Sequence, residues 1–312
     1  MKKISFVIPC YNSGDVLYDV VKEIKKVVKS NYSNYDYEIV LVNDGSPVNI
    51  DILLERISKD VDKTKIIELS KNFGQQNAIM CGLNNCDGDI ILVMDDDGQT
   101  PAKEIPKLIN ALNDGVDVAY AKYRIKKHSG FRNFGSKVND LMLVWLLGKP
   151  KDLYISSFFA MKKYVRDEVI KYTHSYPYLM GLVLRITDKV INVECEHEER
   201  NEGNSGYTLK KLIKLWINGL TNFSVKPLHL SLVFSFFFSL IAFMTLIYLV
   251  IAKLVTNGAP VGWTSMVVII LFIGAVLSFL LGLIGEYIGR IFICINNIPQ
   301  YVVRKENGKI VK

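Results

Sequence analysis

The sequence predicts an α/β domain with a mostly parallel sheet, followed by a hairpin of two membrane-spanning helices. In residues 1–125, short β-branched runs alternate with amphipathic stretches, which is the pattern of βαβ units. After Pro227, the stretches 228–255 and 263–285 are each longer than the ~18 apolar residues that indicate a membrane span. Half of the 312 residues are hydrophobic (50%), a high share for a soluble protein.

The elements of the first domain follow from this alternation. Strands are predicted at Ile4–Ile8, Glu38–Val42, Lys65–Leu69, Ile90–Met94 and Val116–Ala121. Apolar residues at helical spacing predict the intervening helices at Val16–Val28, Ile50–Ser58, Gln76–Cys86 and Ala102–Asn113. In sheets of this kind, functional residues lie at the carboxyl ends of the strands.

The rest of the chain is expected to meet a membrane. Residues 207–227 combine lysines with apolar side chains, as a helix in the membrane interface does. The apolar run Lys137–Leu147 fits either such a helix or an ordinary core helix. The chain therefore divides into six parts: a domain at 1–206, a juxtamembrane segment at 207–227, a span at 228–255, a loop at 256–262, a second span at 263–285 and a tail at 286–312.

The charge of the chain predicts its orientation. The formal net charge is +7, and lysines and arginines flank both spans, whereas the connecting stretch Lys253–Gly262 holds only Lys253. The positive-inside rule places both flanks, and so both termini, at the cytoplasmic face of the plasma membrane. Without an RNA- or DNA-binding motif, the basic charge does not indicate a nucleic-acid partner.

The amino terminus does not resemble a signal peptide, and the spacing of the cysteines does not indicate disulfides or a zinc site. The first apolar run, Ile4–Ile8, is too short and too β-branched for the core of a signal peptide. The five cysteines form no CxxC pair, so neither a disulfide framework nor a zinc site is predicted.

Four polar motifs follow four of the predicted strands directly. They are Pro9–Asn12, Asn43–Ser46, Lys71–Gly74 and Asp95–Asp97. Because carboxyl ends of parallel strands meet at one edge, we expect these loops to converge. No GxGxxG or GxxxxGK[ST] motif is present, so a dinucleotide or P-loop site is not supported.

Three consecutive carboxylates, Asp95, Asp96 and Asp97, end the fourth strand. Holding them together is costly unless a cation neutralises them, and oxygen ligands suit Mg²⁺ or Mn²⁺ bridging a diphosphate. Alternation along an extended segment would turn Asp95 and Asp97 to one side and Asp96 to the other. A solvated DDDG turn is the alternative explanation.

With these motifs in place, the sequence resembles glycosyltransferase family 2. The closer resemblance is to the polyprenyl-phosphate glycosyltransferases, which include dolichol-phosphate mannose synthases and GtrB-like bacterial undecaprenyl-phosphate glycosyltransferases. The matching motifs are VIPCYN (Val7–Asn12), VNDGS (Val42–Ser46), KNFGQQNA (Lys71–Ala78), MDDDGQTP (Met94–Pro101), RNEGNSGY (Arg200–Tyr207), KPL (Lys226–Leu228) and GEYIGR (Gly285–Arg290).

The resemblance implies a GT-A fold, inversion at the anomeric carbon and a set of donor-side residues. The residues that it assigns to the nucleotide are Pro9, Tyr11, Asn12, Asp44, Asn72, Asp95, Asp96 and Gln99. Asp95 and Asp97 would coordinate Mg²⁺ or Mn²⁺, with Asp97 as a catalytic residue.

On the acceptor side, the resemblance points to Arg200 and Ser205 in an RxxGxS element for phosphate binding. Arg124 and Arg132 are the basic residues expected to lead toward the acceptor, and Asp152 is a candidate base or a helix cap. Three positions depart from the family pattern: Ser13 stands where Glu is frequent, Asn43 where Asp is frequent, and Phe159 where Arg is frequent.

The resemblance implies transfer of a sugar from a nucleotide-sugar, with UDP favoured, to a polyprenyl phosphate such as undecaprenyl phosphate, for modification of a cell-envelope glycan. A non-catalytic scaffold or flippase partner and a processive polysaccharide synthase are the alternatives, although the chain lacks a QxxRW-like element and further spans. Glycines at 274, 282, 285 and 289 would allow close helix packing within the hairpin or in a homo-oligomer.

Overall fold

The structure is a computed structural model, and it describes residues 1–123, 144, 149–196, 237, 240, 244, 262–295 and 298–311. The chain divides into two compact units, which we describe separately. The first unit comprises Met1–Leu212 together with Asn297–Lys312, and the second comprises Ile213–Asn296.

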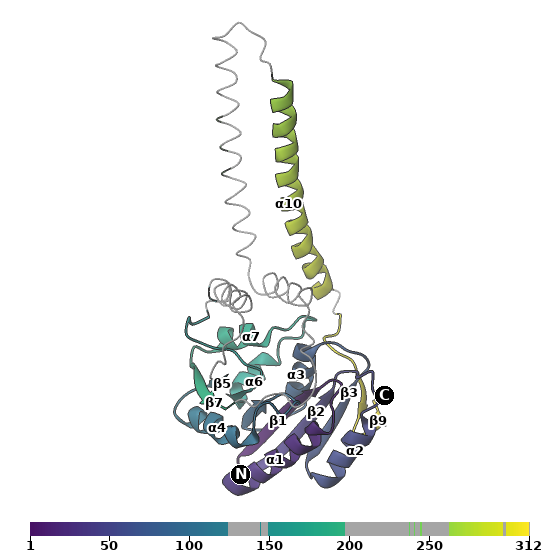
Figure 1. The fold of residues 1–312 in the computed structure, drawn as a ribbon, viewed down its shortest axis with the longest axis vertical. Coiled ribbons are helices and arrows are strands. Elements are labelled where there is room, and N and C mark those ends of the chain that lie inside the picture. Colours follow the sequence, from purple (N-terminus) through teal and green to yellow (C-terminus); the bar gives the residue numbers. More distant parts are fainter. Residues whose placement is uncertain are drawn as a thin grey trace. The chain divides into compact units, whose positions relative to one another are not determined.

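The described residues of the first unit form a nine-stranded sheet with the order β7-β5-β6-β4-β1-β2-β3-β8-β9 (Figure 1). The strands are β1 (Lys3–Cys10), β2 (Asp36–Asn43), β3 (Thr64–Leu69), β4 (Ile90–Val93), β5 (Val118–Tyr123), β6 (Phe159–Lys162), β7 (Val190–Cys195), β8 (Val303–Glu306) and β9 (Lys309–Ile310). Strand β1 pairs in parallel with both β2 and β4, β2 pairs in parallel with β3, and β5 pairs in parallel with β7. Strand β6 is antiparallel to its neighbours β4 and β5. The predicted mostly parallel sheet is thus confirmed.

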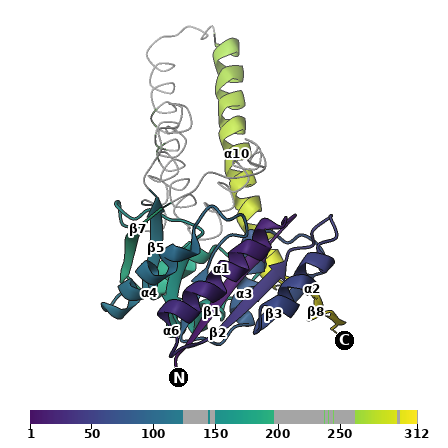
Figure 2. The same ribbon diagram turned by 60° about the horizontal axis from the view of Figure 1, so that its bottom comes forward.

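Helices lie on both faces of the sheet (Figure 2). They are α1 (Val16–Asn31), α2 (Asp51–Asp60), α3 (Gln75–Asn84), the 3₁₀ helix η1 (Ala102–Glu104), α4 (Ile105–Asn113), α6 (Lys163–Val169) and α7 (Leu179–Ile186). One hydrophobic cluster joins α1, α2 and α4 to alternate residues of β1, Ile4, Phe6 and Ile8. Because successive strand residues point to opposite faces, Val7 lies on the other side, where α3 approaches it at Gly82. Burial on both faces explains why the central strands are almost entirely apolar.

The predicted strands and helices of residues 1–123 are all confirmed, with ends that differ by a few residues. The sequence did not reveal β6, β7, α6 or α7. Strand β6 has only four residues, FAMK, which are too few to show a period.

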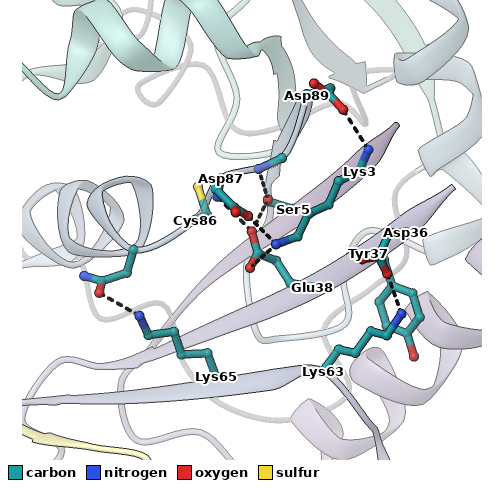
Figure 3. A network of polar contacts seen from close by, with 12 residues as sticks. Lys3, Ser5, Asp36, Tyr37, Glu38, Lys63, Lys65, Cys86, Asp87 and Asp89 are labelled. Atoms are coloured by element: carbon teal, nitrogen blue, oxygen red, sulfur yellow. Dashed lines mark hydrogen bonds and ion pairs between the residues drawn. The ribbon is translucent and has the colours of Figure 1, made fainter. Parts of the chain in front are cut away.

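A polar network closes the amino-terminal edge of the sheet (Figure 3). The side chain of Ser5, which is fully buried, donates to Glu38 at 2.5 Å and accepts a hydrogen bond from the amide of Gly88 at 2.8 Å. The ammonium of Lys3 pairs with Glu38 at 2.9 Å and with Asp87. These contacts tie the starts of β1 and β2 to the turn before β4, at the edge opposite the polar motifs.

The C-terminal residues differ from the predicted tail, 286–312. Helix α10 (Trp263–Ile295) continues ten residues beyond the predicted end of the second span at residue 285. Strands β8 and β9 then extend the sheet of the first unit, with β8 antiparallel to β3. Asn307 fixes the turn between them, because its side-chain oxygen accepts a hydrogen bond from the amide of Ile66 at 2.9 Å and its own amide donates to the oxygen of Ile66 at 2.8 Å. The last described residues are therefore part of the sheet of the first unit.

In the second unit, the structure describes α10, which contains the predicted second span, 263–285. Among the residues that the structure describes, no helix combines the length and the apolar character needed to cross a membrane. The predicted juxtamembrane segment, 207–227, lies outside the described residues. The predicted first span, 228–255, also lies outside them apart from Phe237, Leu240 and Met244.

Candidate active site

The polar motifs meet at the carboxyl edge of the central strands, as predicted. Strands β1 and β2 end together, because Cys10 is paired with Asn43 and the amide of Asp44 donates to the oxygen of Cys10 at 2.9 Å. On the other side of β1, the amide of Met94 donates to the oxygen of Val7 at 3.2 Å. The register of three neighbouring strands therefore places Pro9–Asn12 between Asn43–Ser46 and Asp95–Asp97.

Asp44 joins two of these loops. Its two carboxylate oxygens accept hydrogen bonds from the main-chain amides of Phe73 and Gly74, at 2.7 and 2.9 Å. The side chain is buried, and burial raises the pKa of Asp44, while the two amide hydrogen bonds act in the opposite direction. Asp44 thus holds the loop 70–74 beside the end of β2, whatever else it contacts in a complex.

The first two loops are also bonded to each other. Asn12 has a positive φ of 56°, and its amide donates to the hydroxyl of Ser46 at 3.0 Å. The amide of Ser46 donates to the side-chain oxygen of Asn43, also at 3.0 Å. Asn43, which departs from the family pattern, is buried and stabilises the turn through this hydrogen bond.

Of the other residues predicted to bind the donor nucleotide, Pro9 is buried in β1, whereas Tyr11 is 48% exposed and Asn72 is exposed. Gly45 permits the close packing of the loops. It has φ +61°, and a Cβ atom placed on it would lie 2.3 Å from the carbonyl carbon of Lys71. Only glycine satisfies both conditions at this position.

The three aspartates have different partners. Asp95 accepts hydrogen bonds from the side-chain nitrogen Nε2 of Gln75, at 2.8 Å, and from the hydroxyl of Ser157. Asp96 accepts a hydrogen bond from Ser13, the second position that departs from the family pattern. The amide of Gln99 donates to Asp97 at 3.1 Å. Asp95 and Asp96 thus turn toward different elements, as expected from alternation along an extended segment.

The electrostatics of this cluster favour a cation. Burial raises the pKa of Asp95 to about 6, and the charges of Asp97 and Asp96 act in the same direction. Burial also raises the pKa of Asp96, again with a contribution from Asp97. A positive ion would relieve this repulsion.

The donor set fits an ion that is shared with a substrate. Within the described ranges, no group of three or more His, Cys, Asp or Glu side chains is arranged to hold a metal ion by itself. Mg²⁺ is usually bound through one or two carboxylates together with substrate phosphates and water, not by a cage of protein ligands. Asp95 and Asp97 are the two carboxylates that would hold such an ion, with Gln99 adjacent.

The acceptor side is described only in part. Asp152 is exposed in a turn in which the amide of Leu153 donates to the oxygen of Pro150 at 3.1 Å. The residues that follow it, 153–158, form neither helix nor strand, so Asp152 does not cap a following helix, and its role as a base stays a prediction. Arg124, Arg132, Arg200 and Ser205 lie outside the described residues.

Three residues of the site, Gln75, Ser157 and Ser13, were not predicted as site residues from the sequence. Gln75 belongs to the KNFGQQNA motif, and Ser13 follows the VIPCYN motif, so both could have been found from their neighbours. Ser157 could not, because only the pairing of β4 with β6 brings it to Asp95.

The comparisons with known proteins agree with this geometry. The family model described as Glycosyl transferase family 2 matches residues 5–170, and the model described as GtrB C-terminal hairpin matches residues 226–291.

Similar proteins match nearly the whole chain. The uncharacterized glycosyltransferase YkcC of Bacillus subtilis is 35% identical over 97% of this chain and 94% of its own length. The undecaprenyl-phosphate 4-deoxy-4-formamido-L-arabinose transferase of Proteus mirabilis is 32% identical over 99% of this chain and 95% of its own length. Among solved structures, glucosyl-3-phosphoglycerate synthase from Mycobacterium tuberculosis, in complex with Mn²⁺ and UDP-glucose, has a TM-score of 0.51. It is 16% identical, and the match covers 69% of this chain and 76% of that one, which supports the GT-A-like fold.

Proposed function

Since this chain belongs to glycosyltransferase family 2, we propose that it transfers a sugar from a UDP-sugar to undecaprenyl phosphate, with inversion at the anomeric carbon. The observation that carries the proposal is the meeting of three carboxylates with the loops of β1 and β2, in a chain that matches undecaprenyl-phosphate sugar transferases almost from end to end.

The donor would lie across the carboxyl edge of β1, β2 and β4. Tyr11 is exposed and offers an aromatic ring on which a nucleobase can stack, and Asp44 holds the loop 70–74 beside the end of β2. Asp95 and Asp97 would hold Mg²⁺ or Mn²⁺, and the bound ion would neutralise the charge that develops on the departing diphosphate. The fold relative crystallised with Mn²⁺ and UDP-glucose supports this choice of ion and nucleotide.

The acceptor requires little activation. A phosphate monoester has a second pKa near ~6 and is largely dianionic at neutral pH, so it arrives as a nucleophile. Its oxygen forms the new bond to the anomeric carbon while the bond from that carbon to the nucleotide diphosphate breaks. The protein's main tasks are then to align the two phosphate groups and to offset their mutual repulsion. Arg124, Arg132, Arg200 and Ser205 are the residues that we propose for the second task.

A membrane location follows from the substrate that we propose. A polyprenyl phosphate stays in the bilayer, and the chain carries the GtrB C-terminal hairpin at residues 226–291. We place the catalytic domain at the cytoplasmic face of the plasma membrane, with both termini in the cytoplasm. The basic flanks of the two apolar stretches support this orientation.

The experiment that tests the proposal uses the full-length protein, purified in detergent. It is incubated with Mg²⁺ or Mn²⁺, undecaprenyl phosphate and a panel of UDP- and GDP-sugars, and both nucleoside diphosphate and glycolipid are measured. One donor should yield a glycolipid, and Asp97→Asn should abolish the product. Asp114→Asn, the same change at an exposed residue directly after the C-terminal end of α4, should leave turnover unchanged. A folded protein that forms no glycolipid from any donor would favour the non-catalytic scaffold instead.

A further inference from the structure

The pairing of β4 with β6 places one serine opposite the first aspartate of the cluster. In this antiparallel pair, Val93 at the end of β4 is opposite Phe159 at the start of β6. Two residues beyond Val93 is Asp95, and two residues before Phe159 is Ser157, so the continued register brings the two side chains together. Their hydrogen bond, from the Ser157 hydroxyl to Oδ2 of Asp95, is the result.

The other carboxylate oxygen of Asp95 is held from a different direction. The Nε2 atom of Gln75 donates to Oδ1 at 2.8 Å. Gln75 is the first residue of α3, and the residue before it, Gly74, donates its amide to Asp44. The carboxylate of Asp95 is therefore connected to the loop 70–74 through Gln75 and to the segment before β6 through Ser157.

These two hydrogen bonds leave Asp95 able to bind a cation. An ionised carboxylate has about four lone-pair sites, and each oxygen of Asp95 uses one of them here. Hydrogen bonds of this kind fix the orientation of a carboxylate before the ion arrives, and partners in this position matter to metal sites almost as much as the ligands.

The segment that carries Ser157 is itself anchored on both sides. Asn192 of β7 accepts a hydrogen bond from the amide of Tyr154 at 2.7 Å and donates to the oxygen of Tyr154 at 2.6 Å. On the other side, Phe159 is paired within the sheet. Ser157 lies between these anchors, so its main chain is held at a fixed place beside Asp95.

We propose that Ser157 and Gln75 are positioning residues that hold the carboxylate of Asp95 ready for the metal–diphosphate, and that Ser157 links this carboxylate to the acceptor-side segment 149–158. The inference rests on the proposed function for the identity of the ligand, a divalent cation with a nucleoside diphosphate. Neither residue contacts the reacting atoms in this account, since each acts through Asp95.

The test measures metal binding, so it does not depend on turnover. Full-length protein is titrated with Mn²⁺ in the presence of UDP, and free Mn²⁺ is followed by electron paramagnetic resonance. Ser157→Ala and Gln75→Ala should each weaken Mn²⁺ binding by about 10- to 100-fold, the range expected for lost partners of a metal-binding carboxylate. Ser157→Thr, which keeps the hydroxyl, should restore binding to near the wild-type value.

Ser156→Ala is the matched control. Ser156 is adjacent, but its hydroxyl donates to the main-chain oxygen of Phe158 at 2.7 Å, so its loss should leave Mn²⁺ binding unchanged. Thermal unfolding of each variant is recorded alongside. A lower melting temperature with wild-type Mn²⁺ binding in Ser157→Ala would mean a purely structural role and would overturn the proposal. If Ser157→Ala does not fold, Gln75→Ala decides the question in the same way.

The outcomes also separate this inference from the proposed function. Wild-type protein that binds Mn²⁺ with UDP but forms no glycolipid would refute the transfer reaction and leave the positioning role measurable. Wild-type protein that forms glycolipid, with Ser157→Ala and Gln75→Ala binding Mn²⁺ normally, would refute only the positioning role.

Discussion

The main-chain amide of Ser70 donates a hydrogen bond at 2.9 Å to the main-chain oxygen of Val302. Ser70 begins the loop whose amides, at Phe73 and Gly74, bind Asp44. The C-terminal segment is thus hydrogen-bonded directly to the start of the loop 70–74. Ion pairs reinforce this edge of the sheet, with Lys305 at 2.9 Å from Glu68 and Lys65 at 3.0 Å from Glu306.

The turn that ends this segment should contribute measurably to stability. Asn307→Ala removes the acceptor of the Ile66 amide and places a less tolerant residue at φ 47°. We expect a loss of about 1–3 kcal/mol in the free energy of unfolding. Asn307→Gly loses the same acceptor but tolerates the positive φ, so its loss should be smaller. Chemical denaturation of the full-length protein measures both, and equal losses in the two variants would argue against a backbone contribution.

The packing of the loop 43–46 against the loop 70–74 depends on Gly45. Gly45→Ala adds a methyl group that would meet the backbone of Lys71 at a residue with φ +61°. Gly115→Ala is the matched control, because Gly115 has a similar φ of +85° but open space around it. Strain at a positive φ costs about 1–3 kcal/mol in either variant, and the steric clash should add to it only in Gly45→Ala. Thermal unfolding and UDP binding should both be affected more at Gly45; equal effects would contradict the close approach of the loops.

An ion pair on the surface predicts a pH dependence. A hydrogen bond from Lys25, with another from Tyr37, lowers the pKa of Asp62 to about 2. Because the folded pKa lies below the usual value of about 3.9, the pair stabilises the fold above that pH and its contribution is lost as the pH falls toward 2. Asp62→Asn should therefore lower the melting temperature slightly at pH 7, and the difference should shrink between pH 4 and pH 2. A difference that does not change over this range would refute the assignment. The effect is small because the carboxylate is largely exposed.

The cysteines of the α/β domain should be unreactive in the native state. Burial raises the pKa of Cys81, Cys86 and Cys195 to about 12 and that of Cys10 well above its usual range. The thiolate is the reactive form, so alkylation at pH 8 should be slow until the protein unfolds. Peptide mapping by mass spectrometry after iodoacetamide treatment, with and without denaturant, measures each site. Rapid labelling of any of these four in the folded protein would show that the site opens.

Much of the α/β domain could be predicted because short stretches of sequence are enough to identify its central strands and the loops that follow them. The runs Ile4–Ile8 and Ile90–Met94 are apolar enough to identify central strands, and polar motifs directly after them mark the carboxyl edge. The motif resemblance identified the family, which the comparisons confirmed. The membrane orientation and the roles of Asp152 and the arginines stay predictions.

The order of apolar runs and polar motifs was enough to predict that Asp95, Asp96 and Asp97 share a site with the loops after β1 and β2, because strand ends in a parallel sheet meet at one edge. The residues that hold these carboxylates in place are known only from the folded chain. Ser157 reaches Asp95 through a four-residue antiparallel strand, and Val302 reaches Ser70 through a strand from the far end of the chain. Such pairings depend on register and on long-range packing of segments too short to show a hydrophobic period, so no local pattern in the sequence records them.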